Sequence, residues 1–263
     1  DITRAGALVA AMKAEGVAYF LIICRNDAYG SGLADEIRAR TLEYRGARLV
    51  YEPGATDFTP YLDTVLEYVH SQEGVFLPAQ IGVVIAGFDE TATLMAQAAN
   101  YEELGNLRWY CSEGWSGSSD YFSNPALSAF LVRTGLTATQ LGVAPEVNQD
   151  WRAEVAARFE ARTGVAPSAE HLLFYDAVWV AALTQNGVPA RVSRERLLEK
   201  LGETLDSACG ITGCLSVDNA GDRRLAVYEY VRVKETGGSY AWSKAGSFRR
   251  DDTGVETLVW NQE

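Results

Sequence analysis

The stretch VAYFLIICRNDAYGSGLADEIRARTLEYRG, residues 17–46, contains the pattern that decides the fold. Its first eight residues are apolar without alternation, which is typical of a strand buried on both faces. Over 32–46 apolar residues recur at helical spacing, and Gly46 ends the run. A turn with Gly30 and Gly32 joins the two parts. The stretch therefore predicts a buried β-strand followed by an amphipathic helix, the repeating unit of α/β proteins.

The same alternation extends over the first half of the chain. Helices are predicted over 4–16, 57–72 and 89–105, and a further strand over 127–135. Strands that alternate with helices imply right-handed crossovers and a parallel sheet with helices on both faces. We therefore expect four neighbouring parallel strands, with the first one internal: 17–24, 47–52, 81–88 and 107–114.

The second half follows a different pattern. Three helices are predicted in succession, and from residue 208 the sequence predicts antiparallel strands over 213–217, 223–233 and 239–248, with a turn at 218–222. Three amphipathic helices need a surface to cover, and this half supplies few strands. We expect a second copy of the chain, or a further segment, to cover the apolar faces of the helices at 148–164, 168–187 and 192–205, including Leu172, Leu173, Phe174, Val178 and Trp179.

Composition excludes several classes of partner. The 263 residues have a formal net charge of −12, which disfavours binding to a nucleic-acid backbone. No stretch approaches the roughly 20 apolar residues that span a bilayer, so we expect no direct membrane span. The opening DITRAGALVAAMK has no initiator methionine and predicts a chain truncated at its N-terminus.

The four cysteines divide into two pairs. Cys24 and Cys111 end apolar runs and are expected to be buried, reduced thiols. Cys209 and Cys214 bound the short loop CGITGC, and we predict a disulfide between them, formed in an oxidising compartment. Zinc binding is the alternative. It is disfavoured because no second Cys or His pair accompanies the two cysteines, and we expect no metal site.

Nucleotide and hydrolase motifs fail on inspection. GSGLAD has Asp35 where a dinucleotide fingerprint needs its third glycine, and there is no P-loop, so we expect no cofactor. GWSGS, residues 114–118, ends in Ser118 where a nucleophile elbow needs glycine. DNAGD, residues 218–222, lacks the spacing of a calcium loop and predicts a hairpin turn. We predict that the protein is not an enzyme.

Residues suited to ligand binding follow three of the predicted strands. Asp27 and Tyr29 follow the first, Phe88 the third, and Glu113 with Trp115 the fourth. Ligands of open α/β sheets bind beyond the carboxyl ends of the strands. Aromatic side chains beside one carboxylate predict a pocket for a small molecule that bears an ammonium group.

Taken in order, several segments resemble the type I periplasmic binding proteins, above all the branched-chain amino-acid (leucine/isoleucine/valine) receptors of ABC transporters. The resemblance covers residues 1–248. The segments are DAYGSGLADEIRARTLEYRGARLVYE, GATDF, IGVVIAGFDETATLMAQAA, RWYCSEGW, FYDAVWVAAL and GITGCLSVDNAGDRRLAVYEYV.

The resemblance implies an α/β fold of two lobes that close over a ligand like a Venus flytrap. Residues 1–134 would form the second lobe, with a Rossmann-like parallel sheet. Residues 135–227 would form the returning part of the first lobe, with helices and a short strand. Residues 228–263 would cross back and supply the C-terminal strands. The first lobe would be present only in part.

The resemblance also implies roles for the site residues. Glu113 would pair with the α-ammonium of the ligand, Phe88 would pack against the ligand, and Tyr29 would line the cleft, with Trp115 as a further apolar wall. The Ser/Thr-rich element that binds the ligand carboxylate in such receptors has no counterpart in this sequence.

The implied function is that of an extracytoplasmic solute receptor, made with a signal peptide, with or without a lipid anchor, in the periplasm or at the cell surface. It would deliver an amino acid or a similar small molecule to an ABC permease. Two alternatives are a ligand-binding sensor module of a signalling receptor and a doubly wound α/β enzyme. A homo-oligomer of the truncated chain is a further expectation.

Overall fold

The computed structural model describes all residues except 1, 42–45, 113–119, 145, 220 and 262–263. The chain divides into two compact units. Unit 1 comprises residues 1–140, 229–248 and 258–263, and unit 2 comprises residues 141–228 and 249–257. Each unit is therefore built from segments that are distant in the sequence.

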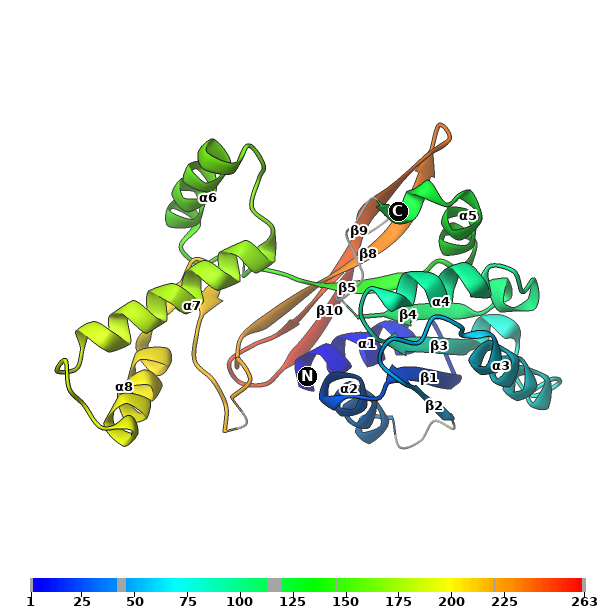
Figure 1. Ribbon diagram of the computed structural model, residues 1–263, viewed down its shortest axis with the longest axis horizontal. Helices are drawn as coiled ribbons and strands as arrows, with labels where there is room; N and C mark the ends of the chain where they lie inside the picture. The colour runs from blue at the N-terminus through cyan, green and yellow to red at the C-terminus, as the bar shows by residue number, and fades with distance from the viewer. Residues whose placement is uncertain (1, 42–45, 113–119, 145, 220, 262–263) are drawn as a thin grey trace. The chain divides into compact units, whose positions relative to one another are not determined.

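Unit 1 is built on a mixed sheet ordered β10-β9-β8-β5-β4-β3-β1-β2 (Figure 1). Strand β1 pairs in parallel with β2 and β3, and β4 pairs in parallel with β3 and β5. The prediction of four parallel neighbours with the first strand internal is confirmed. The strands are β1 (Tyr19–Arg25), β2 (Arg48–Tyr51), β3 (Ile81–Ala86), β4 (Arg108–Cys111), β5 (Thr137–Leu141), β8 (Ala226–Thr236), β9 (Ser239–Arg250) and β10 (Glu256–Trp260).

Helices cover both faces of the parallel strands. On β1, Leu21 and Ile23 belong to one hydrophobic core with residues of α3, α4 and α5, whereas Phe20 and Ile22 are buried on the opposite face, as alternation along a strand requires. Coverage on both faces explains why β1 is apolar without alternation. The helices are α1 (Ile2–Ala14), α2 (Ala28–Ala39), α3 (Thr59–Ser71), α4 (Glu90–Ala98) and α5 (Pro125–Thr134), with short 3₁₀ turns at Pro78–Gln80, Glu103–Asn106 and Asp120–Ser123.

The strand predicted over 127–135 is wrong, because this segment forms helix α5. The Asn124 side chain accepts hydrogen bonds from the backbone N–H groups of Ala126 and Leu127, and Pro125 occupies the first turn. Gly135 ends the helix in the left-handed conformation, with φ of 59°. The apolar residues that suggested a strand recur at helical spacing, and the fifth strand begins only after the glycine.

The antiparallel part of unit 1 comes from the end of the chain. Strands β8 and β9 are neighbours joined by Gly237 and Gly238, a two-residue connection that makes them a hairpin. Tyr230 on β8 is fully buried and donates a hydrogen bond to the backbone oxygen of Ala7 in α1, 2.6 Å away. The last strands of the chain are thus fastened to its first helix.

Unit 2 contains helices α6 (Gln149–Thr163), α7 (Ala169–Asn186) and α8 (Arg194–Ser207) and the two-residue strands β6 (Cys209–Gly210) and β7 (Gly213–Cys214). Strands β6 and β7 pair antiparallel. The strand predicted over 213–217 is therefore much shorter than expected. The turn predicted at 218–222 is confirmed, because an antiparallel bridge joins Val217 to Arg223 across it.

The loop between β6 and β7 is held by a buried carboxylate. Asp176 of α7 is 2% exposed and accepts hydrogen bonds from the backbone N–H groups of Ile211 and Thr212, each at 2.8 Å, and from the Thr212 hydroxyl at 2.5 Å. A disulfide joins Cys209 to Cys214 across the same loop. The loop is thus closed at its base and anchored at its tip.

Apolar side chains of α7 and α8 are exposed in unit 2. Phe174 is 73% exposed and Val178 is 69% exposed, and Trp179, Leu183 and Leu198 are exposed as well. Of the residues expected on this face, Leu172 is instead buried. Helix α6 has no buried residue. Much of the apolar surface of these helices thus has no cover within the residues that the structure describes.

Candidate functional site

The carboxyl ends of β1, β3 and β4 lie side by side in unit 1. Cys24 of β1 is in register with Ala86 of β3, and Ile85 of β3 with Cys111 of β4. The residues that follow these strands therefore meet at one edge of the sheet, which we call the carboxyl edge.

Helix α2 begins at this edge and brings Tyr29 to it. Asp27 is the N-cap, and its side chain accepts a hydrogen bond from the Gly30 N–H at 2.8 Å. A Cβ atom at Gly30 would collide with the backbone of Arg25. The glycine therefore allows the helix to begin close to the strand. Tyr29 lies in the first helical turn, not in a loop as the sequence suggested.

Tyr29 and Phe88 form a stacked pair at the carboxyl edge. Their ring centroids are 4.6 Å apart with an interplanar angle of 23°. The Tyr29 hydroxyl donates a hydrogen bond to Oγ of Ser112, 2.6 Å away, and Ser112 follows β4 directly. Phe88 is 37% exposed. Side chains from all three strand ends are thus joined, with one aromatic ring open to solvent.

A guanidinium group lies over each ring of this pair. The Arg4 Cζ atom is 5.2 Å from the Tyr29 ring centroid, and the Arg25 Cζ atom is 5.2 Å from the Phe88 centroid. Both distances are within the range of cation–π attraction. The chain itself therefore supplies cations to both rings of the aromatic pair.

A charged network lies behind Phe88. The Arg25 guanidinium contacts the carboxylates of Asp27 at 2.8 Å and Glu90 at 3.3 Å. Glu90 also accepts a hydrogen bond from the hydroxyl of Tyr51, 2.7 Å away. Burial tends to raise the pKa of the Glu90 carboxyl, but hydrogen bonds from Tyr51, from the backbone N–H groups of Glu90 and Phe88 and from Arg25 outweigh it, so the pKa lies below its ordinary value. Glu90 is therefore ionised at neutral pH.

Two of the predicted site residues, Tyr29 and Phe88, are brought together. The other two, Glu113 and Trp115, lie outside the residues that the structure describes. Sequence reasoning missed Arg25, Glu90 and Ser112, although each is within a few residues of a strand end. Inspection of every polar side chain near those ends would have found them. Arg4 gave no such signal, because its position depends on how α1 packs.

Within the described ranges, no group of three or more His, Cys, Asp or Glu side chains is placed to hold a metal ion. Among the same residues, no helix has the length and apolar character that crossing a membrane requires. Cys24 and Cys111 are buried and are not disulfide-bonded, and burial raises the pKa of the Cys24 thiol despite the neighbouring Arg48.

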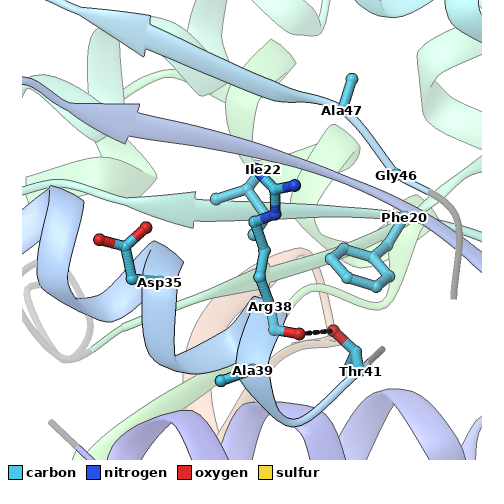
Figure 2. A pocket seen from close by; sticks show the side chains of 8 residues that line it. All are labelled: Phe20, Ile22, Asp35, Arg38, Ala39, Thr41, Gly46 and Ala47. Carbon is cyan, nitrogen blue, oxygen red and sulfur yellow. Dashed lines mark hydrogen bonds between the residues drawn. The ribbon is translucent and has the colours of Figure 1, made fainter. Parts of the chain in front are cut away.

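A cavity of about 370 Å³ lies elsewhere in unit 1, toward the amino ends of β1 and β2 (Figure 2). In the sequence, residues 42–45 fall between the lining residues Thr41 and Gly46 and are outside the described part of the chain, so no site is assigned there. Its lining is Phe20, Ile22, Asp35, Arg38, Ala39, Thr41, Gly46 and Ala47.

Known proteins resemble this chain over most of its length. The leucine binding protein LivK of Thermotoga maritima has a TM-score of 0.64 and 17% identity, with 96% of this chain and 66% of that protein covered. LivJ of Streptococcus pneumoniae, a branched-chain amino acid transporter substrate binding protein solved with isoleucine, has a TM-score of 0.61 and 16% identity, with 92% and 64% covered. These likenesses establish the fold of the type I periplasmic binding proteins.

Sequence comparison gives the family. The uncharacterized protein MJ1266 of Methanocaldococcus jannaschii is 23% identical over 240 residues, which are 86% of this chain and 55% of that protein. The chain thus spans less than two thirds of the length of these relatives. The model of the family described as "Receptor family ligand binding region" matches residues 1–236. The chain therefore belongs to the family of receptor ligand-binding regions.

Proposed function

We propose that the protein is an extracytoplasmic solute receptor that binds an amino acid or a similar small molecule and delivers it to an ABC permease. The observation that supports this most directly is the meeting of Tyr29, Phe88 and Ser112 at the carboxyl edge, immediately before Glu113. Ligands of open α/β sheets bind at this edge. Two proteins of the same fold are named for binding leucine or branched-chain amino acids.

In this proposal, Glu113 pairs with the ammonium group of the ligand, and Tyr29, Phe88 and Trp115 supply apolar contact. The receptor does no chemistry. Ligand binding favours a closed state of the receptor, and the permease distinguishes that state from the open one. The disulfide between Cys209 and Cys214 supports a location outside the cytoplasm, where such bonds persist.

Calorimetry on the complete receptor with a panel of amino acids tests this proposal. A hydrogen bond to a charged group contributes about 1.5–3 kcal/mol, so Glu113→Gln should weaken amino-acid binding about tenfold or more. Glu102→Gln, which removes an exposed carboxylate elsewhere in unit 1, is the control and should leave the affinity unchanged. Equal affinity in the Glu113 variant, or a preference for ligands without an amine, would exclude Glu113 from the site.

A sensor module of a signalling receptor is the second candidate, favoured by the description of the matching family as a receptor ligand-binding region. The two roles differ in what the bound state contacts. Uptake of labelled ligand by cells that lack the gene decides between them: an importer receptor is required for uptake, and a sensor is not.

A further inference from the structure

The side chain of Glu90 joins three strand ends in unit 1. Glu90 is the first residue of α4, and its carboxylate folds back toward the sheet. It accepts hydrogen bonds from Tyr51 at the end of β2, from Arg25 at the end of β1, and from the backbone N–H of Phe88, which follows β3. One carboxylate therefore connects β1, β2 and the turn between β3 and α4.

Both groups that Glu90 holds at the carboxyl edge bear on the Phe88 ring of the aromatic pair. The N–H of Phe88 is 3.3 Å from Oε1 of Glu90, which fixes the backbone from which the Phe88 ring projects. Nη1 of Arg25 is 3.3 Å from each carboxylate oxygen, and the same guanidinium lies over the Phe88 ring. Movement of Glu90 would release the ring on two sides.

Tyr51 in turn holds Glu90 from within the core. Tyr51 is fully buried, and its hydroxyl donates to Oε1 of Glu90 at 2.7 Å. A Cβ atom at Gly87 would collide with this hydroxyl, so the glycine leaves room for the contact. Because no atom of Tyr51 reaches the surface, its hydroxyl can affect a ligand only through its neighbours, and Glu90 is the neighbour that accepts its hydrogen bond.

We propose that Glu90 is a positioning residue of the ligand-binding edge, which holds Phe88 and Arg25 in the arrangement that a ligand meets. This inference rests on the proposed function only for its affinity measurement. Glu90 does not itself contact the ligand in this proposal. Its charge is satisfied by Arg25, and its remaining acceptor sites by Tyr51 and Phe88.

The test measures ligand affinity and amide exchange together in the complete receptor. Glu90→Ala should accelerate hydrogen exchange of the Phe88 amide and weaken ligand binding about fivefold to tenfold, less than the loss of a charged hydrogen bond to the ligand itself, because Glu90 acts only through Phe88 and Arg25. Tyr51→Phe, which keeps the packed ring and folds, should weaken binding about twofold to threefold. In the Glu90→Ala background, the same Tyr51 change should have no further effect on affinity.

Asp89→Asn is the matched control. Asp89 is exposed, precedes Glu90 and makes no side-chain hydrogen bond at the helix cap, so the change removes one negative charge without breaking a cap. It should change neither affinity nor exchange. A merely structural role for Glu90 predicts a lower melting temperature with unchanged affinity, and that result would overturn the proposal. If the wild type binds no amino acid, the proposed function fails, and hydrogen exchange of the Phe88 amide alone tests the inference. Faster exchange in Glu90→Ala then supports a positioning role for Glu90, and unchanged exchange refutes it.

Discussion

At the scale of single residues, two buried or half-buried carboxylates organise the protein. Glu90 joins strand ends in unit 1, and Asp176 holds the loop between Cys209 and Cys214 in unit 2. Both accept several hydrogen bonds, which is how a carboxylate is tolerated away from water. Neither carboxylate was identified from the sequence, because the donors that reach it are far away along the chain. Tyr51 is 39 positions from Glu90, and Ile211 is 35 positions from Asp176.

Asp176→Asn should destabilise unit 2. The amide nitrogen would face backbone N–H groups of Ile211 and Thr212 that now donate to the carboxylate, leaving at least one buried donor unpaired. We expect a loss of about 3 kcal/mol in the free energy of unfolding, measured by urea denaturation. Glu170→Gln, at an exposed position on the same helix, should cost below about 1 kcal/mol. Equal losses in both variants would contradict a special role for the Asp176 carboxylate.

At the scale of elements, the sequence predicts the parallel strands well and the helix α5 badly. Strands β1 and β3 are almost entirely apolar because both of their faces are covered. Such a run can be recognised from the sequence without knowing which segments pack against it. The apolar run in α5 is short enough to suit either a strand or a helix. Its cap residues, Asn124 and Gly135, carry the distinguishing information.

The difference between local sequence signals and contacts between distant segments also explains what could be predicted of the site. Tyr29 and Phe88 follow buried strands, and the rule that ligands bind at carboxyl ends is enough to bring them together. The cation over the Tyr29 ring could not be predicted. Arg4 is in α1, and its approach to Tyr29 depends on the packing of α1 against α2.

Asn124→Ala should destabilise α5 and, with it, unit 1. The Asn124 side chain accepts from two backbone N–H groups that have no helical partner, so its loss should cost about 1 kcal/mol. Chemical denaturation followed by circular dichroism measures this. Asn100→Ala, at an exposed position after α4, is the control and should be close to neutral. No difference between the two variants would show that the cap contributes nothing.

At the scale of the whole molecule, α7 presents an apolar face that is exposed to solvent. Leaving a large apolar side chain in water forgoes roughly 1.5–3 kcal/mol, and Phe174, Val178 and Trp179 are all exposed. Such a face needs a partner. We expect either a second copy of the chain or a further segment to cover it.

Light scattering on the isolated 263-residue chain distinguishes these cases. The chain should associate beyond its mass of 28.7 kDa, and Phe174→Asp should restore the monomer. Leu77→Asp changes a similarly exposed residue in unit 1 and should leave association unchanged. A well-folded monomer that binds amino acids tightly by itself would contradict the expectation that another copy or segment covers this face of α7. It would also contradict the expectation that part of the ligand site comes from outside these 263 residues.

Because unit 1 is assembled from segments that are far apart in the sequence, its sheet can be completed only after all of them have been synthesised. Residues 1–140 supply the parallel strands, but Tyr230, which fastens β8 to α1, is made only after segment 141–228 of unit 2 has been synthesised. Until then β5 is an unpaired edge, the kind of surface on which other chains assemble. Its closure is a pairing between distant parts of the chain, which is slow. The nascent protein therefore stays open along one side of the sheet until β8 has been synthesised, and over that interval it depends on protection from aggregation.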